Sequence, residues 1–218
     1  MTMLKPRLVA RRVVDGVSTV IRDFEAGTIA DETNMTDRLA SAISVTLDGA
    51  KIGGITWRAR TLRTGRGIAA EEKRHGADLL GVLEIDLPVR KTRKGFLAQA
   101  KIAEPGQLLR NSEWGRFKDQ CKTMLDRTDE AFGVIYSRQR GVIFLPARTI
   151  LEIDRDQLFN AGSRTLHGFF EDHIQCEIGD RKLHSPSIDV LDALIRTEFP
   201  EMASYGADSI LCMKATNA

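Results

Sequence analysis

Two apolar runs separated by a short basic stretch dominate the middle of this 218-residue chain. Residues 79–87 read LLGVLEIDL, and residues 96–102 read FLAQAKI. Runs of this length, rich in branched residues and bounded by Pro88 and Gly95, are typical of β-strands. The connection Pro88–Gly95 is short enough to join antiparallel neighbours, so we predict a hairpin with a cationic tip. The rest of the fold must pack around this pair.

Three polar side chains lie within or beside these runs. Asp78 precedes the first run, and Gln99 and Lys101 interrupt the second. Because side chains alternate between the faces of a strand, Gln99 and Lys101 leave the same face, and they require partners if they are buried. A carboxylate and an amide oxygen suit Mg²⁺, and a lysine can stabilise an attacking hydroxide. The pattern therefore predicts metal-assisted hydrolysis of a phosphodiester.

Helix and strand patterns flank the hairpin. Capping residues at Asp31–Asn34 precede an amphipathic pattern that predicts a helix at Met35–Leu47, ending near Gly49. Residues 4–25 fit either a strand or an amphipathic helix. The other elements predicted before residue 150 are a strand at Ile55–Leu62, a helix at Ser112–Arg127, and strands at Ala131–Tyr136 and Gly141–Pro146.

The last third of the chain predicts a helix near Ser163–His173, a short strand near Gln175–Ile178, a helix at Ser187–Phe199 and a strand near Ser209–Met213. No repeat or linker separates this part from the rest. We therefore predict an α/β fold of the α+β kind, built around a mixed central sheet. Residues 1–30 form a peripheral element, residues 31–150 the core, and residues 151–218 an extension packed on the same domain.

The triplets Gly76-Ala77-Asp78 and Gln99-Ala100-Lys101, placed at the two strands of a hairpin, resemble the PD-(D/E)xK nuclease superfamily in its QxK variants. The resemblance implies a restriction-endonuclease-like α-β-β-β-α-β core. That order agrees, apart from one extra strand, with the elements predicted between residues 31 and 146. Ala77 stands where the motif name has proline, and Gln99 stands where it has a carboxylate.

The resemblance also implies roles for individual residues. Asp78 and Gln99 would bind the metal, Mg²⁺ with Mn²⁺ as a substitute, and Lys101 would assist the attacking water. The neutral Gln99 makes a further acidic ligand desirable. Glu32 stands at a position that family members often use for this purpose, and Glu71, just before the motif, is the next choice. The expected activity is that of a Mg²⁺-dependent DNA endonuclease, of a defence or restriction type.

Basic residues supply the expected contacts with double-stranded DNA. The net charge of +2, from 32 basic and 30 acidic residues, is too balanced to indicate a polyanionic partner, so local clusters must do so. The candidate phosphate contacts are Arg58, Arg60, Arg90, Lys91, Arg93 and Lys94. A catalytically silent module that binds nucleic acid or assembles with other proteins is the alternative, and the family's defence nucleases can require homo-oligomerisation or an activating ligand.

The remaining patterns bound the environment of the protein. Three widely spaced cysteines without a CxxC pair indicate neither a disulfide framework nor a zinc ribbon, and favour a reducing cytoplasm. No signal peptide is evident at Met1–Gly16, and no apolar run approaches the roughly 20 residues of a membrane span. Gly65–Ala70 imitates a dinucleotide-binding GxGxxA fingerprint, but the chain before the hairpin is too short for a crossover helix.

Overall fold

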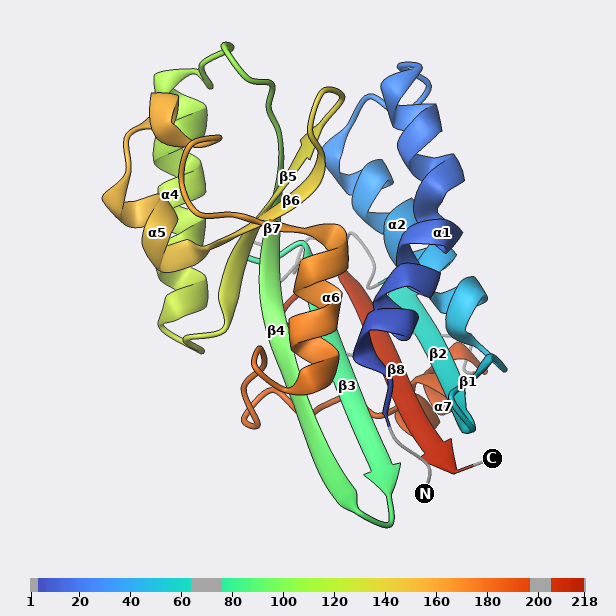
Figure 1. The fold of residues 1–218 in the computed structure, drawn as a ribbon. Helices are drawn as coiled ribbons and strands as arrows, with labels where there is room; N and C mark the ends of the chain where they lie inside the picture. The colour runs from blue at the N-terminus through green and yellow to red at the C-terminus, as the bar shows by residue number, and fades with distance from the viewer. Residues whose placement is uncertain (1–3, 64–75, 197–204, 218) are drawn as a thin grey trace.

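The computed structural model describes residues 4–63, 76–196 and 205–217, which form a mixed eight-stranded sheet with helices on both faces (Figure 1). The strands are β1 (Lys51–Ile52), β2 (Ile55–Arg63), β3 (Leu79–Leu87), β4 (Arg90–Ile102), β5 (Ala131–Ser137), β6 (Gly141–Pro146), β7 (Arg164–Thr165) and β8 (Ser209–Asn217). The helices are α1 (Pro6–Glu25), α2 (Glu32–Leu47), α4 (Asn111–Leu125), α5 (Ala147–Glu152), α6 (Leu166–Gln175) and α7 (Ile188–Ile195), and a short 3-10 turn covers Arg155–Gln157.

The predicted hairpin is present, but its tip is much shorter than predicted. Strands β3 and β4 pair antiparallel from Leu79↔Ala98 to Leu87↔Arg90, which leaves Pro88 and Val89 as the turn. The basic residues that we assigned to the tip therefore belong to β4. Register explains the extension, because the pairs Glu84↔Arg93 and Asp86↔Lys91 place opposite charges across the strands.

The last strand lies in the interior of the sheet. The strand order is β1-β2-β8-β3-β4-β5-β6-β7, with β8 antiparallel to β2 and parallel to β3 (Figure 1). The segment 151–218 thus contributes a strand to the middle of the sheet that residues 31–150 begin. The strands β2 and β3, which are neighbours in the described sequence, do not pair with each other.

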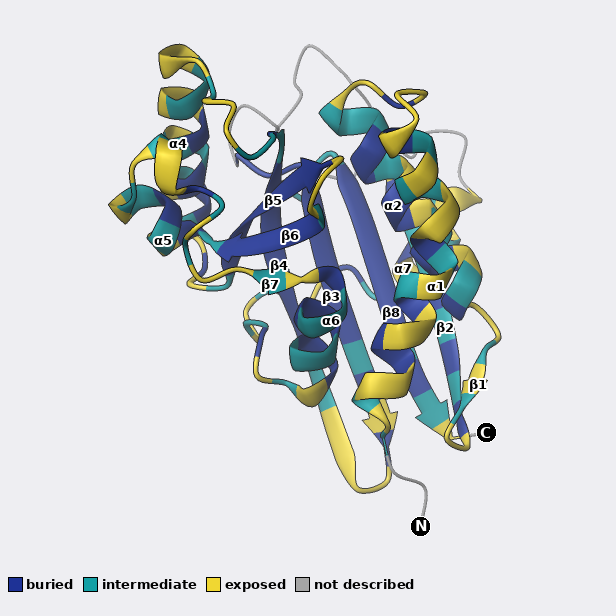
Figure 2. Cartoon of the chain, turned by 45° about the horizontal axis from the view of Figure 1, so that its top comes forward, coloured by how far each residue is buried: buried dark blue, intermediate teal, exposed yellow. Residues whose placement is uncertain are grey.

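Two apolar clusters cover the two faces of the sheet. One contains buried residues of α1, α2 and α6, and the other contains buried residues of α4, α5 and α7 (Figure 2). In α1, Val9, Val13 and Val17 are buried at a spacing of four residues, which resolves the ambiguous N-terminal pattern as a helix. Stacked and edge-on rings around Phe169 fill the cluster beneath α6.

Two further predictions concern helices and their ends. Asp31 caps α2 as predicted, because its side chain accepts a hydrogen bond of 2.7 Å from the backbone N–H of Asn34. The predicted strand near Gln175–Ile178 is wrong. The backbone of Cys176 adopts the left-handed conformation that ends α6, and its N–H donates hydrogen bonds back to the helix.

Within the described ranges, no helix combines the length and apolar character needed to cross a membrane.

Candidate active site

Asp78 sits where the chain enters β3, and its backbone is fixed on two sides. Its N–H donates to the carbonyl of Ala98, and its carbonyl accepts from the N–H of Ser209, both at 2.9 Å. The side chain is only 7% exposed, and its Oδ2 accepts a hydrogen bond of 2.8 Å from the backbone N–H of Ala100. Strand pairing therefore holds this carboxylate against β4, the strand that carries the QxK triplet.

Gln99 contacts Asp78 directly. Its side-chain nitrogen Nε2 donates to Asp78 Oδ2 at 2.5 Å, and the residue is 2% exposed. The other end of the same amide, Oε1, is buried and has no hydrogen-bond partner among the residues that the structure describes. A buried acceptor left unsatisfied costs about 1–3 kcal/mol, so this oxygen is a chemically open position in an otherwise paired cluster.

Lys101 is held by Glu32 at the start of α2. The ammonium donates to Glu32 Oε2 at 2.7 Å, and the backbone N–H of Ile102 donates to Glu32 Oε1 at 3.1 Å. The Lys101 ammonium also lies 5.9 Å from the ring centroid of Phe117 in α4. Both carboxylate oxygens of Glu32 are thus engaged in fixing the end of β4.

The structure joins four of the five residues predicted for the site in two pairs, Asp78 with Gln99 and Glu32 with Lys101. The charges of Lys101 and Glu32 both act on Asp78, so the two pairs are neighbours. They come from one helix and two strands, and the sequence alone could not show that Glu32 reaches Lys101. Glu71 lies outside the described residues, as does the Gly65–Ala70 fingerprint.

The electrostatic setting makes Asp78 unusual among the described carboxylates. Burial raises the pKa of Asp78 from 3.8 to about 7. The Ala100 N–H and the charge of Lys101 lower the pKa, whereas the negative charges of Asp208 and Glu32 raise it further. Asp78 therefore exchanges its proton near neutral pH, where an ordinary aspartate is fully ionised.

Sequence analysis missed Asp208. This residue immediately precedes β8, which pairs in parallel with β3, and its charge acts on Asp78. A signal was available, because Gly206-Ala207-Asp208 repeats the triplet Gly76-Ala77-Asp78, and in both places an apolar strand follows shortly. The repeat carries structural meaning only once β3 and β8 are known to be neighbours.

Comparison with known proteins leaves the site to be interpreted from its own residues. No protein-family model, curated protein or solved structure matches the chain. Among the described residues, no group of three or more His, Cys, Asp or Glu side chains is arranged to hold a metal ion. The ligands that this cluster offers a cation are the Asp78 carboxylate and the Gln99 amide oxygen.

One of the predicted phosphate contacts requires correction. Lys94 is 2% exposed, and its ammonium donates to the carbonyl of Ile178 inside the protein. Burial lowers the pKa of Lys94. The hairpin is longer than predicted, so Lys94 lies within β4 rather than in a solvent-exposed turn, and it cannot contact a DNA phosphate in this conformation.

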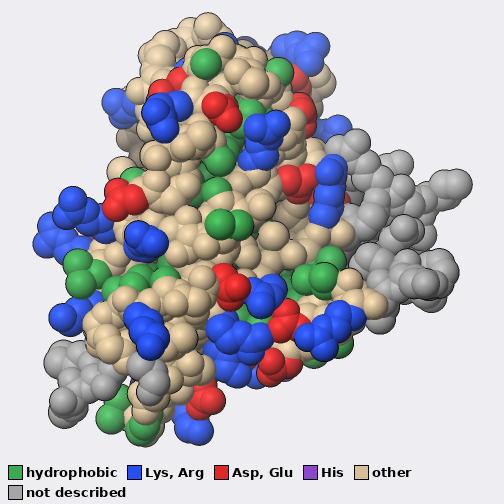
Figure 3. Space-filling model, turned by 90° about the vertical axis from the view of Figure 1, so that its right-hand side faces the viewer, with side chains coloured by type: hydrophobic (Ala, Val, Ile, Leu, Met, Phe, Trp, Pro, Cys, Tyr) green, Lys and Arg blue, Asp and Glu red, His purple; other side chains and the backbone are tan. Residues whose placement is uncertain are grey.

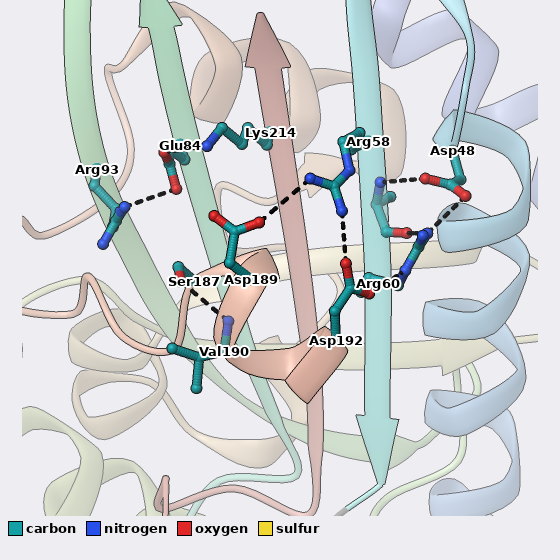
Figure 4. Close-up of polar contacts among 11 residues, drawn as sticks. Asp48, Arg58, Arg60, Glu84, Arg93, Ser187, Asp189, Val190, Asp192 and Lys214 are labelled. Carbon is teal, nitrogen blue, oxygen red and sulfur yellow. Dashed lines mark hydrogen bonds and ion pairs between the residues drawn. The ribbon is translucent and has the colours of Figure 1, made fainter. Parts of the chain in front are cut away.

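The other predicted cations are largely paired within the fold. Arg58 binds Asp189 and Asp192 of α7, and Arg60 binds Asp48 and Asp192 (Figure 4). Figure 3 shows basic and acidic side chains interspersed on the side of the molecule that lies to the right in Figure 1. The cations on this face therefore lie among carboxylates rather than in a purely basic patch.

Gly76 sets the direction from which Asp78 approaches β4. Its φ is +67°, and an added Cβ would meet the carbonyl oxygen of Gln120 at 2.8 Å. We expect Gly76→Ala to lower the free energy of unfolding by about 2–3 kcal/mol, combining the left-handed penalty with the clash.

Urea titration can measure the effect of Gly76→Ala against a matched control. Gly106 has a φ of +79° with nothing within 4 Å of an added Cβ, so Gly106→Ala should cost only about 1–2 kcal/mol. Equal costs for the two variants would contradict a tight approach of the Gly76 backbone to α4.

Proposed function

We propose that this protein is a metal-dependent DNA endonuclease with a restriction-endonuclease-like core. The main support is the convergence of Asp78, Gln99 and Lys101 at the ends of β3 and β4, with Glu32 beside them. In this proposal, α2, β2, β3, β4, α4 and β5 correspond to the α-β-β-β-α-β core, and β8 is an inserted neighbour of β3.

The residues fit a divalent cation with oxygen ligands. Asp78 offers a carboxylate, and Gln99 offers its buried Oε1, for which the described part of the chain supplies no hydrogen-bond donor. Mg²⁺ prefers such ligands and retains several waters, so one or two carboxylates suffice. When bound, the cation would neutralise phosphate charge and lower the pKa of a coordinated water.

Lys101 and Asp78 would have different roles beside the bound cation. Lys101 is 12% exposed and is oriented by Glu32, so its ammonium is available to stabilise negative charge that develops on the phosphoryl group. Because the pKa of Asp78 is about 7, removing its proton costs little free energy near neutral pH, and the resulting carboxylate can bind a cation.

Incubation of supercoiled duplex DNA with the full chain and Mg²⁺ or Mn²⁺ tests the proposal. We expect nicked and linear products with the wild-type protein and none in the presence of a chelator. Asp78→Asn should abolish cleavage because the amide offers the cation a weaker ligand. Cleavage that persists in Asp78→Asn, or no cleavage with any divalent metal, would contradict the proposal.

A catalytically silent module that binds nucleic acid is the second candidate. It is favoured by the pairing seen at the site, where Glu32 and Lys101 neutralise each other and Asp78 bonds to Gln99. Isothermal titration calorimetry separates the two candidates. Mn²⁺ binding that is lost in Asp78→Asn supports the enzyme, whereas DNA binding without any metal binding supports the module.

The exposed tip of the hairpin should carry any contact with DNA. Arg90 and Lys91 are exposed, so the double variant Arg90→Gln with Lys91→Gln should reduce the slope of log affinity against log salt by about 2. Fluorescence anisotropy with a labelled duplex and a chelator, between about 50 and 200 mM salt, measures this slope.

The buried Lys94 provides the matched control for this measurement. Lys94→Met keeps the length of the side chain and removes a charge that solvent does not reach, so the salt slope should stay at the wild-type value. A slope that falls equally in Lys94→Met would mean that the hairpin opens when DNA binds.

A further inference from the structure

Two hydrogen-bonded hydroxyl groups link β5 to the first turn of α2. The hydroxyl of Thr36 donates to the carbonyl oxygen of Glu32 at 2.9 Å, and the hydroxyl oxygens of Thr36 and Tyr136 lie 2.8 Å apart. A threonine hydroxyl has one hydrogen, which Thr36 gives to Glu32, so Tyr136 is the donor to Thr36. The hydrogen bonds therefore run from the phenol on β5 through Thr36 to the turn that carries Glu32.

Both hydroxyl groups are buried, although packing does not require them. The Tyr136 ring meets the Phe24 ring edge-on, with 6.3 Å between centroids, and a phenylalanine could make the same contact. Removing a hydroxyl group from water costs free energy that its hydrogen bonds must offset. The hydroxyl pair is thus explained by the two elements that it connects rather than by the space that it fills.

The turn that receives these hydrogen bonds also holds the end of β4. Glu32 accepts from the Lys101 ammonium at 2.7 Å and from the Ile102 N–H at 3.1 Å. Ile102 is the partner of Tyr136 in the parallel pairing of β4 with β5, and the N–H of Ala103 donates to the Tyr136 carbonyl at 3.1 Å. Tyr136 is therefore linked to the end of β4 twice, once through its backbone and once through its side chain.

The charges of the candidate site also act on the Tyr136 phenol. Burial raises the pKa of Tyr136, the hydrogen bond with Thr36 lowers it, and the negative charges of Asp78 and Glu32 raise it further. The phenol therefore stays protonated near neutral pH, and its hydroxyl remains a hydrogen-bond donor to Thr36.

We infer that Tyr136 is a positioning residue for Lys101 and acts through Thr36 and Glu32. Its hydroxyl holds the first turn of α2 against β5, which keeps the Glu32 carboxylate on the Lys101 ammonium. This inference rests on the proposed function and deepens it, because it names the group that orients the lysine assigned to the phosphoryl charge. A group that stabilises developing charge is most effective when it is held in place before the reaction.

Amide hydrogen exchange of the metal-free protein, followed residue by residue by NMR, tests the link from Tyr136 to Glu32 without relying on activity. The Ile102 N–H donates to Glu32, whereas the neighbouring Ala103 N–H donates to the Tyr136 carbonyl. We expect Tyr136→Phe to accelerate the exchange of Ile102 about tenfold more than that of Ala103. Thr36→Val should do the same, and Thr36→Ser, which keeps a hydroxyl, should restore the wild-type rates.

Single-turnover DNA cleavage with saturating Mg²⁺ tests the link from Glu32 to Lys101. Tyr136→Phe should slow cleavage by about fivefold to tenfold when Lys101 is present. In the Lys101→Met background the same change should have no further effect, because the group that it positions is absent. Thr128→Val is the matched control, since it removes another buried threonine hydroxyl, one that donates to Asp180 at 2.9 Å, and it should cleave at the wild-type rate.

The outcomes separate this inference from the proposed function. Equal acceleration of Ile102 and Ala103 exchange in Tyr136→Phe would mean that the hydroxyl only stabilises the fold, and would overturn the inference. Slowing of cleavage by the same factor with and without the Lys101 ammonium would also overturn it. Wild-type protein that cleaves no DNA, together with selective exchange of Ile102 in Tyr136→Phe, would overturn the nuclease proposal and leave the positioning of Lys101 in place. Thr36→Val gives the same comparisons if Tyr136→Phe does not fold.

Discussion

Replacing Lys101 with methionine should lower the rate of metal-dependent DNA cleavage by about 10²–10³-fold, the usual cost of removing one preorganised group that stabilises transition-state charge. Methionine keeps a side chain of similar length and removes the ammonium, which lies 5.9 Å from the ring centroid of Phe117. Glu32 loses its ion-pair partner, but its side chain is 34% exposed and water can solvate it. The fold should therefore survive, and the loss should lie in the chemical step.

Single-turnover cleavage with saturating Mg²⁺ measures this step, and Mn²⁺ binding should stay within about threefold of the wild-type affinity. Lys122→Met is the matched control, because Lys122 lies on the exposed side of α4 and its nearest acidic partner, Asp119, is 3.7 Å away. A Lys101→Met protein that cleaves at the wild-type rate would remove Lys101 from the mechanism. A protein that loses Mn²⁺ as well would show that Lys101 supports the metal rather than the chemistry.

Local sequence patterns suffice for most of the elements that surround the site. The strands β3, β5 and β6 and the helices α2 and α4 are recognisable because each pattern spans a single element with its own turn residues. The hairpin follows from the short connection between its strands. Asp78, Gln99 and Lys101 could be selected for the same reason, because they lie in or beside one such hairpin.

The parts that sequence analysis missed depend on contacts between distant segments. The sequence of β8 does not indicate that this strand lies between β2 and β3, because the apolar pattern of a buried strand does not identify its neighbours in the sheet. The nearness of Asp208 to Asp78 is hidden for that reason. Lys94 was misplaced by a different effect, since cross-strand ion pairs such as Arg93 with Glu84 extend β4 beyond its apolar run.

The candidate site thus depends on a contact between the first half of the chain and its last strand, β8. Residues near 32, 78 and 100 come from the first half, but the backbone of Asp78 is completed only when Ser209 of β8 donates to its carbonyl. A site assembled from both ends of the chain is competent only in the fully folded protein. Sequence separation of this size also predicts slower folding than local contacts would allow.

Asp78→Asn should raise the free energy of unfolding of the metal-free protein by roughly 2–4 kcal/mol at pH 8, and by far less at pH 5. Folding raises the pKa of Asp78 from 3.8 to about 7, chiefly through burial. Between these two values the folded chain binds more protons than the unfolded chain, so wild-type stability falls as the pH rises through this window. Asparagine has no charge to bury, and its oxygen can still accept from the Ala100 N–H.

Urea unfolding with a chelator, repeated at pH 5, 6, 7 and 8, measures this difference. Asp119→Asn is the control, because its side chain is 76% exposed and its effect should stay flat with pH. A difference between Asp78→Asn and wild type that does not grow with pH would mean that Asp78 is ionised without penalty in the fold. Saturating Mg²⁺ should reverse the order at pH 8, because only the wild type gains binding energy from the cation. A carboxylate that destabilises the empty protein and stabilises the metal-bound one is placed for a ligand rather than for the fold.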